Sequence, residues 1–509
     1  METKTAAIEM RNITKRFGPV LANDKVWLNI YRGEILALLG ENGSGKTTLM
    51  NMLSGIYFPD EGEIKIDGKE VVIRSPKDAF DNGIGMIHQH FKLVDVLTAA
   101  ENIVLGLPGK LDLKAASAKI RKICDKYGFS VDPAQKIYDM SVSQKQTVEI
   151  VKVLYRGADI LILDEPTAVL TPQETDKLFA VLRNMRNDGK AIVIITHKMH
   201  EVEALSDRVA ILRHGQFIGD MLTAHTNAQE MTNMMVGHAV SLNIERPDPV
   251  DPKPRIEVKG LTVRSVDGIV KLDDVSFTAN SGEILGIAGI SGCGQKELLE
   301  AIAGLQTVES GSISYIEDDG SREELIGKDP LSIAELGVSL SFVPEDRLGM
   351  GLVGNMNLAD NMMLRSFRRG KSIFTDRRSP RALAESVVQE LSVSTPSVDT
   401  PVRRLSGGNV QKVLVGREIA SAPTVLLTAY AVRGLDIHSS YTIYDLINRQ
   451  KKAGVAVIFV GEDLDVLLEL CDRILVLCGG KVSGIVSGRG AEKREVGMMM
   501  TKLGGQSHE

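Results

Sequence analysis

Short hydrophobic runs alternate with longer stretches of mixed polarity along the whole chain, and this pattern predicts alternating strands and helices. The runs within residues 33–39, 159–164 and 191–196 have the length of a buried strand. A helix is predicted over 47–53, after the glycine-rich loop that follows the first run, and a polar, lysine-rich helix over 111–127. The alternation favours α/β domains with mostly parallel sheets.

The pattern occurs twice. The segment GEIL at 33–36 recurs at 282–285, and the same shift places further glycines of the first half on glycines of the second. Later, SDRV at 206–209 corresponds to CDRI at 471–474, so the second halves also align after a modest insertion. The sequence therefore predicts two copies of one domain.

A proline-rich segment marks the join between the copies. IERPDPVDPKP at 244–254 carries four prolines and several charges, which favours an extended, semi-rigid connector. We therefore predict a first domain over 1–240, a linker over 241–255 and a second domain over 256–509.

Composition fits a globular protein and excludes some classes of function. The 509 residues exceed one ordinary core, and 43% are hydrophobic and 25% charged. With 60 basic against 66 acidic residues and a net charge of -6, nucleic acid is not an expected partner. The apolar runs are far shorter than a membrane span, and the N-terminus lacks an apolar signal core. The four cysteines make no paired motif, which suits reduced thiols in the cytoplasm.

Residues 40–48, GENGSGKTT, fit the phosphate-loop pattern G-x-x-x-x-G-K-[ST] between a predicted strand and a predicted helix. The glycines let backbone N–H groups curl round phosphates, and the helix N-terminus adds unsatisfied donors. Lys46 is expected to reach the outer phosphates, and the Thr47 hydroxyl to ligate Mg²⁺. The residues expected to hold a nucleoside triphosphate here are Gly40, Asn42, Gly43, Ser44, Gly45, Lys46, Thr47 and Thr48.

Two carboxylates follow a strand downstream of this loop. The strand at 159–164 ends in Asp164, and Glu165 follows it. After a phosphate loop, Asp164 can hold Mg²⁺ directly or through water, and Glu165 can orient and deprotonate the attacking water. The pair therefore indicates hydrolysis of the bound nucleotide.

Three further residues have candidate roles in the same site. His197 follows the strand at 191–195 and could contact the γ-phosphate, although a lone histidine there is usually structural. Gln89 could sense the metal and the attacking water. Phe17 lies where an aromatic ring could stack on adenine, and core packing is the alternative.

The order of these motifs resembles that of the nucleotide-binding domain of ABC transporters. The motifs are the phosphate loop, Gln89, a serine-led turn at 141–144, the carboxylates and the histidine. The resemblance covers both copies and implies a parallel-sheet core, an antiparallel β subdomain and a helical subdomain in each. In that family the serine-led turn is the signature motif, normally LSGGQ, which caps the γ-phosphate of ATP on the opposing domain. The first copy departs from it, because Val142 and Ser143 replace the two glycines. Thr171 also replaces the usual D-loop aspartate.

The second copy has lost the catalytic groups and kept the signature. LSGGN at 405–409 is nearly intact, and Asp436 retains the D-loop aspartate. A loop without the lysine, the metal ligand and the base should hydrolyse little or nothing. The replacements are Gln295 for Lys46, Lys296 for Thr47, Glu345 for Gln89, Ala429 for Asp164, Tyr430 for Glu165 and Glu462 for His197.

The losses sort by site. In the family, two domains pack head to tail, so each nucleotide lies between the phosphate loop of one and the signature of the other. The resemblance implies that this chain forms such a dimer within itself. The intact first loop would then meet the intact half-site Ser406, Gly407, Gly408 and Asp436, and all the degenerate features would meet in the opposite site. This predicts one catalytic and one non-hydrolytic site.

The tandem arrangement, PEDR at 344–347 and RGLD at 433–436 resemble the ATPase subunit of bacterial importers of simple sugars and nucleosides. HQHFKL at 88–93 and TAAENI at 98–103 are most similar to the nucleoside branch. The resemblance implies ATP and Mg²⁺, a place on the cytoplasmic face of the cell membrane, two permease subunits and an extracellular lipoprotein that delivers substrate.

Three alternatives stay open. The chain could serve import of a simple sugar of the ribose or galactose type. A soluble, translation-associated tandem ABC ATPase is expected to have two working sites and a long, charged helical linker, so Gln295, Ala429 and the short proline-rich linker oppose it. A nucleotide-gated scaffold without turnover would require a dead first site.

Overall fold

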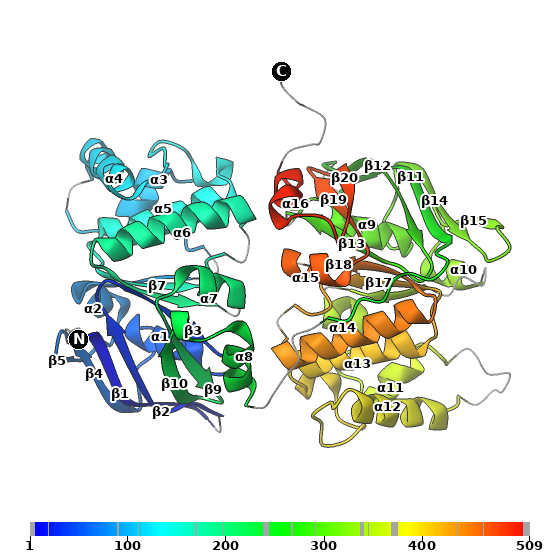
Figure 1. The fold of residues 1–509 in the computed structure, drawn as a ribbon, viewed down its shortest axis with the longest axis horizontal. Helices are drawn as coiled ribbons and strands as arrows, with labels where there is room; N and C mark the ends of the chain where they lie inside the picture. The colour runs from blue at the N-terminus through cyan, green and yellow to red at the C-terminus, as the bar shows by residue number, and fades with distance from the viewer. Residues whose placement is uncertain are drawn as a thin grey trace. The chain divides into compact units, whose positions relative to one another are not determined.

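The computed structural model describes residues 6–18, 20–88, 91–109, 111–167, 170–196, 198–237, 244–265, 268–290, 292–335, 340–344, 346–367, 375–433, 435–461 and 463–501. The chain divides into two compact units, one up to Ser241 and the other from Leu242 (Figure 1).

A six-stranded sheet forms the centre of the first unit, with strand order β10-β9-β3-β8-β7-β6. All neighbours are parallel except β9 and β10, which pair antiparallel at one edge. Every residue of β3, β6, β7 and β8 is buried, which explains why these segments are hydrophobic apart from Glu34 at the start of β3 and Asp164 at the end of β7. The strands are β3 (Glu34–Leu39), β6 (Ile84–Ile87), β7 (Ile160–Asp164), β8 (Ala191–Ile195), β9 (Arg208–Arg213) and β10 (Gln216–Leu222).

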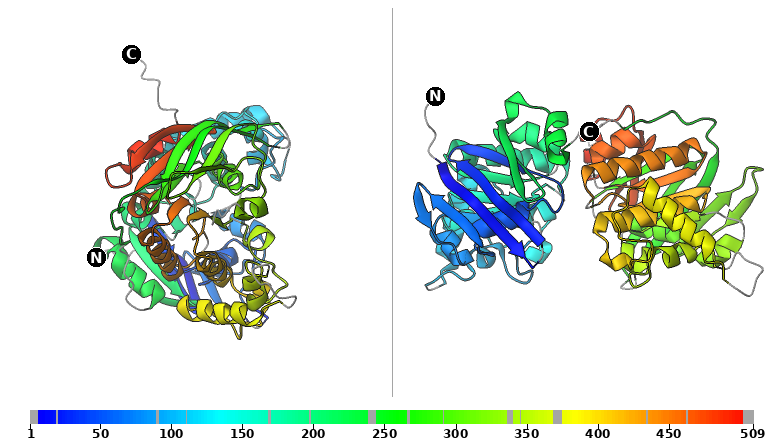
Figure 2. Two further views of the ribbon diagram at one scale, coloured as in Figure 1. Left: turned by 90° about the vertical axis from the view of Figure 1, so that its right-hand side faces the viewer. Right: turned by 90° about the horizontal axis from the view of Figure 1, so that it is seen from below.

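Two smaller layers flank this sheet. Strands β1, β2, β4 and β5 form an antiparallel sheet of order β2-β1-β4-β5, and Figure 2 (right) shows its blue strands side by side. In Figure 1 this sheet lies at one end of the unit, and helices α3, α4 and α5 lie at the other. The strands are β1 (Ala6–Phe17), β2 (Val20–Tyr31), β4 (Glu61–Ile66) and β5 (Lys69–Val71). The helices of the unit are α1 (Lys46–Leu53), α2 (Pro76–Asp81), α3 (Ala99–Val104), α4 (Leu113–Tyr127), α5 (Val142–Tyr155), α6 (Pro172–Asn187), α7 (Met199–Leu205) and α8 (Ala228–Val236).

Helix α4 confirms the lysine-rich helix predicted from the sequence. It begins after Asp112, whose carboxylate accepts hydrogen bonds from two backbone N–H groups, and ends at Gly128 with φ of 87°. Ile120 and Cys124 on its buried side pack into a cluster with residues of α3 and α5. The lysines therefore cover the solvent side of a small helical layer beside the main sheet.

The second unit repeats this architecture. Its six-stranded sheet has the order β16-β17-β18-β13-β19-β20, and β13 pairs in parallel with β18 and β19 as β3 does with β8 and β9. Its strands are β11 (Pro254–Arg264), β12 (Val270–Asn280), β13 (Ile284–Gly289), β14 (Ser310–Ile316), β15 (Arg322–Glu324), β16 (Leu340–Val343), β17 (Val425–Ala429), β18 (Ala456–Val460), β19 (Arg473–Cys478) and β20 (Lys481–Ser487). Its α-helices are α9 (Gln295–Ile302), α10 (Pro330–Glu335), α11 (Leu358–Met363), α12 (Arg378–Glu390), α13 (Gly407–Ala420), α14 (Ile437–Lys452), α15 (Leu464–Leu470) and α16 (Lys493–Met499).

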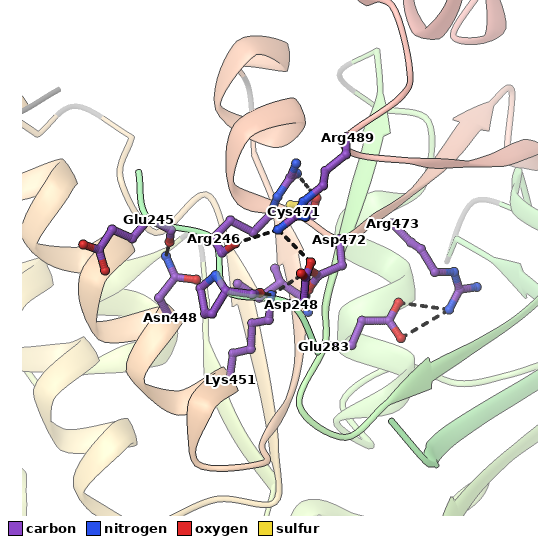
Figure 3. A network of polar contacts seen from close by, with 12 residues as sticks. Glu245, Arg246, Asp248, Glu283, Asn448, Lys451, Cys471, Asp472, Arg473 and Arg489 are labelled. Atoms are coloured by element: carbon purple, nitrogen blue, oxygen red, sulfur yellow. Dashed lines mark hydrogen bonds and ion pairs between the residues drawn. The ribbon is translucent and has the colours of Figure 1, made fainter. Parts of the chain in front are cut away.

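The described part of the proline-rich linker has no regular secondary structure before β11, and it packs against the second unit. No helix or strand occurs between residues 244 and 253, and β11 begins at Pro254, within the predicted linker. Ile244 is buried in the core of the second unit, and Arg246 donates hydrogen bonds to the carbonyls of Leu468 and Cys471 at 2.7 and 2.5 Å (Figure 3). The described part of the linker is therefore a fixed part of this unit.

The linker also covers an ion pair at the base of the main sheet. Lys451 donates to the carbonyl of Pro247 and pairs with Asp472 at 2.6 Å (Figure 3). These two side chains are 1% and 10% exposed, whereas the corresponding pair of the first unit, Arg186 and Asp207, is 28% and 35% exposed. The linker thus buries in the second unit a contact that water reaches in the first.

Candidate functional site

A cavity of about 260 Å³ opens over the phosphate loop of the first unit. Its walls come from the start of β2, the loop with the first turn of α1, and the ends of β7 and β8. The residues that line it are Val20, Leu21, Ala22, Asn42, Gly43, Ser44, Gly45, Lys46, Thr47, Thr48, Asp164, Glu165 and Ile195.

Glycine is required where the loop turns into α1. Gly45 has φ of 96°, and a Cβ atom added there would lie 2.4 Å from the carbonyl of Ala22 and 2.6 Å from the Asn23 amide nitrogen. Among the described residues, no side chain caps this helix end. The first N–H groups of α1 are therefore available to phosphate oxygens.

Lys46 is held inside the loop. Its side chain donates to the carbonyls of Gly40 and Glu41 at 2.6 and 2.9 Å, and the residue is only 8% exposed. Burial lowers the pKa of Lys46, and the nearby charges of Glu165 and Asp164 oppose that shift. A bound phosphate would add opposite charge close to this ammonium group and so favour its charged form.

Two buried oxygen atoms in this region have no hydrogen-bond partner in the described structure. They are Ser44 Oγ, which belongs to the cavity wall, and Asn23 Oδ1 beside the loop. A buried polar atom left unpaired costs about 1–3 kcal/mol. The unpaired Ser44 hydroxyl therefore supports a polar ligand in this cavity, and the loop fits a polyphosphate.

The two carboxylates lie directly across the cavity from the start of α1. Asp164 Oδ2 lies 3.4 Å from Thr47 Oγ1. Burial, and then the charge of Glu165, raise the pKa of Asp164 to about 6, while the Thr47 hydrogen bond and the Lys46 charge oppose the rise. A divalent cation beside Thr47 and Asp164 would restore the ionised carboxylate, so these oxygen atoms fit Mg²⁺.

Glu165 sits in a tight turn just after β7. Its φ is 45°, in the left-handed region that a non-glycine residue enters at a cost, and its N–H donates to the carbonyl of Ile195 at 2.9 Å. Because this turn ends in the cavity wall, the Glu165 side chain is held at the mouth of the phosphate loop.

The remaining predicted residues of the first site have different outcomes. Phe17 is 41% exposed and packs edge to face on Tyr57 at 5.1 Å, so the core-packing alternative is wrong. It pairs across the hairpin with Val20, a residue of the cavity wall, and stacking on adenine stays a prediction. Gln89 and His197 lie outside the described residues.

Sequence reasoning missed the contribution of β2. Ala22 and its neighbours in the wall carry no motif, and Asn23 touches the loop through a 3.3 Å hydrogen bond to the carbonyl of Gly45. The nearest signal in the sequence is Phe17 in the hairpin before β2. It indicates this part of the site but not the contacts that Ala22 and Asn23 make.

The second unit keeps the backbone of the loop and replaces its chemistry. Gly294 has φ of 98°, and the Gln295 side chain donates to the carbonyl of Ile290 at 3.1 Å. Lys296 is exposed and pairs with Glu300 on its own helix at 3.7 Å. Lys296, which occupies the position of Thr47, therefore pairs with a residue of its own helix.

The carboxylate turn is also copied in shape. Tyr430 has φ of 53°, and its N–H donates to the carbonyl of Val460 at 2.9 Å, as Glu165 does to Ile195. Ala429 before it is buried. The strained turn persists, although the residues at both positions have lost their carboxylates.

The predicted signature of the second unit forms one surface with the D-loop aspartate. Ser406 caps α13 and accepts a hydrogen bond from the Asn409 side chain at 2.9 Å. Asp436 caps α14 and accepts from the N–H of Ser439 at 2.7 Å. A Cβ atom on Gly408 would lie 3.8 Å from Asp436 Oδ2, so the two helix ends are neighbours.

In the first unit the serine-led turn also caps a helix. Ser141 accepts a hydrogen bond from the N–H of Gln144 at 3.3 Å, and the Gln144 side chain accepts from the N–H of Ser141 at 2.8 Å. Val142 presents an exposed apolar side chain beside this cap. The cap is retained, but side chains stand where the family pattern has glycine.

Comparison with known families agrees with this geometry. The sequence matches the ABC transporter family over residues 23–168 and 272–428, which include both phosphate loops. The chain belongs to the ABC transporter family. The two matches confirm the predicted fold class of two tandem ABC ATPase domains, and the chain is an ATPase of the class coupled to transport.

Individual ABC proteins resemble the chain over almost its whole length. It is 42% identical to the nucleoside import ATP-binding protein NupA of Lactococcus lactis, over 99% of each chain. It is 39% identical to the glucose import ATP-binding protein TsgD13 of Haloferax volcanii, over 98% of this chain and 96% of that one.

A solved ABC structure has the same fold. The archaeal ribosome recycling factor aABCE1, in complex with the ribosomal stalk protein aP1, superposes with a TM-score of 0.60. The match covers 91% of this chain and 87% of that one at 16% identity, which shows the fold alone. Across the residues that the structure describes, no helix is both long and apolar enough to span a membrane.

Proposed function

We propose that this chain is the ATP-hydrolysing subunit that powers import of nucleosides across the bacterial cytoplasmic membrane. The observation that carries the proposal is the assembly of Lys46, Thr47, Asp164 and Glu165 round one cavity, with Gln295 in the lysine position of the other loop. The names of the full-length relatives support import as the purpose of this hydrolysis.

Each group of the first site has a distinct role in this proposal. Lys46 binds the outer phosphates, and its two present carbonyl contacts hold it ready for them. Thr47, Asp164 and Gln89 hold Mg²⁺, which when bound neutralises phosphate charge. Glu165 orients the attacking water and accepts its proton, and His197 contacts the γ-phosphate. Phe17 stacks on the adenine ring.

The catalytic site is completed by the other domain. The two domains pack head to tail, so that Ser406, Gly407, Gly408 and Asp436 cover ATP held on the first loop. The sorting of the losses supports this arrangement, since the second unit has lost its loop and kept its signature. ATP draws the domains together and hydrolysis releases them, which shifts the attached permeases between access states.

The subunit works on the cytoplasmic face of the membrane with two permease subunits and an extracellular lipoprotein that delivers substrate. The relative NupA and the run at 88–93 favour nucleosides. The relative TsgD13 favours the alternative, a simple sugar. The degenerate second loop opposes a role in translation, for which two working sites are expected.

Uptake in a strain that lacks this chain tests the proposal. We expect labelled nucleosides to be excluded, and ribose and galactose to enter normally. Loss of sugar uptake with normal nucleoside uptake would show that the transported substrate is a sugar and not a nucleoside. Co-purification of the chain with ribosomes, and not with membrane subunits, would overturn the importer itself.

A further inference from the structure

A short insertion distinguishes the second unit from the first beside the signature. The N–H of Val94 donates to the Asn102 side chain at 2.7 Å, and that of Val353 to Asn361 at 2.8 Å, so the two valines are equivalent. The stretch from position 345 to 353 is three residues longer than the stretch from 89 to 94. The extra length lies in a wide π-helical turn, Arg347–Gly351.

Arg347, at the start of this turn, contacts both halves of the proposed signature surface. Its guanidinium donates to the carbonyl of Gly407 at 3.2 Å and to the carbonyl of Arg433. Gly407 lies in the signature, and Arg433 begins the RGLD segment that ends in Asp436. One planar side chain therefore fixes the backbone of two segments that cap neighbouring helices.

The other end of the turn holds the same helix at a second point. Arg417 in α13 donates to the carbonyl of Gly351 at 2.6 Å. In the first unit the equivalent Lys152 donates to the carbonyl of Lys92 at 3.0 Å, so this contact is common to both copies. The contact through Arg347 is made in addition, by the second unit.

The charge beside the signature is also specific to this unit. Burial, and then the charge of Arg433, lower the pKa of Arg347, whose guanidinium reaches the start of α13 at the Gly407 carbonyl. In the first copy, Phe91 occupies the second position after Gln89, and Ala168 aligns with Arg433. Both arginines thus accompany the signature that is intact and are absent beside the degenerate one.

We propose that Arg347 is a positioning residue for ATP hydrolysis, which locks the Ser406–Gly408 turn to the Asp436 segment so that both meet the γ-phosphate together. This inference rests on the proposed function, in which the second unit completes the site of the first. The arginine acts through the backbone that it holds and through its positive charge, without touching the reacting atoms.

Steady-state hydrolysis by the purified full-length chain tests this role. Arg347→Met removes both hydrogen bonds and the charge, and Arg347→Lys keeps the charge but loses the planar fork. We expect kcat to fall at least tenfold in Arg347→Met and to take an intermediate value in Arg347→Lys. The KM for ATP, the affinity for a fluorescent ATP analogue and the melting temperature should stay near wild type, because the first loop is untouched.

The matched control is Arg449→Met, which removes an arginine of the same unit whose ion pair with Glu390 is exposed. It should leave kcat unchanged. The inference is overturned if Arg347→Met stays within twofold of the wild-type kcat, if Arg449→Met loses as much, or if the melting temperature and nucleotide affinity fall together with kcat.

Glu165→Gln in the same assay distinguishes a failure of the Arg347 role from a failure of the proposed function. Abolished turnover in Glu165→Gln with normal turnover in Arg347→Met would remove only the role of Arg347. Normal turnover in Glu165→Gln would remove the proposed function on which that role rests.

Discussion

The Gln295 side chain donates a hydrogen bond to the carbonyl of Ile290 at 3.1 Å. Lys46 makes the equivalent contact with Glu41 at 2.9 Å in the first loop. The glutamine therefore fills the place of the lysine and satisfies the same carbonyl, but without a positive charge. The second loop keeps its folded shape and loses its strongest attraction for phosphate.

Hydrolysis should depend on one carboxylate of the first site, Glu165. Glu165→Gln keeps the size of the side chain and removes the base, so we expect kcat to fall by about 10²–10⁴-fold. Gln295→Ala should stay within about twofold of wild type, because its loop takes no part in the chemical step. Phosphate release measures both, and an equal loss in the two variants would contradict the single catalytic site.

The two helix-start glycines offer a matched pair of substitutions. An added Cβ would lie 2.4 Å from the Ala22 carbonyl at Gly45 and 2.5 Å from the Lys271 carbonyl at Gly294, both at positive φ. Gly45→Ala and Gly294→Ala should each lower the free energy of unfolding by about 1–3 kcal/mol. Only Gly45→Ala should also lose ATP binding. Urea unfolding and nucleotide titration check this, and equal loss of binding in both would contradict it.

Sequence reasoning placed residues whose positions are set within one local element. Lys46 and Thr47 follow from the loop spacing, and the buried strand before Asp164 follows from its unbroken hydrophobic run. Asn23 could not be placed in this way, because it comes from β2 and no local spacing ties it to Gly45. Such contacts depend on how distant elements pack.

The same limit applies to the linker and to the second loop. The prolines of the linker predict an extended segment, but nothing in the sequence shows that Arg246 donates to the carbonyls at the end of α15. The replacement of lysine by Gln295 was visible, whereas its hydrogen bond inside the loop depends on a backbone shape that both copies share.

Asp164 should destabilise the nucleotide-free protein at neutral pH. Its pKa is raised to about 6 by burial, from an ordinary 3.8. The folded chain therefore binds this proton more tightly than the unfolded chain, so stability from this group is present at low pH and is lost as pH rises through about 6. Asp164→Asn should raise the free energy of unfolding at pH 7 by about 2–3 kcal/mol.

Urea unfolding of the wild type and Asp164→Asn without nucleotide or Mg²⁺ measures this difference. It should shrink as pH falls from about 6 to about 4 and be absent at lower pH, where the wild-type carboxyl is protonated in both states. A gain that does not depend on pH would show that the cause is not ionisation. The same variant should hydrolyse ATP poorly, since it loses a proposed Mg²⁺ ligand.

The linker should contribute measurably to the stability of the second unit. Arg246 donates to two carbonyls at the end of α15, where a cation also complements the negative end of the helix. Arg246→Ala removes both charged hydrogen bonds and leaves these carbonyls without this donor. We expect a loss of about 2–3 kcal/mol in the unfolding transition of this unit.

Lys253→Ala is the control within the same linker. Its ion pair with Asp251 is exposed at 3.6 Å, so its removal should change stability by less than about 0.5 kcal/mol. Amide hydrogen exchange shows which part of the chain is affected. Arg246→Ala should accelerate exchange in α15 and leave exchange in the first unit unchanged. Equal effects of the two variants would mean that the linker is attached through its ends and not through Arg246.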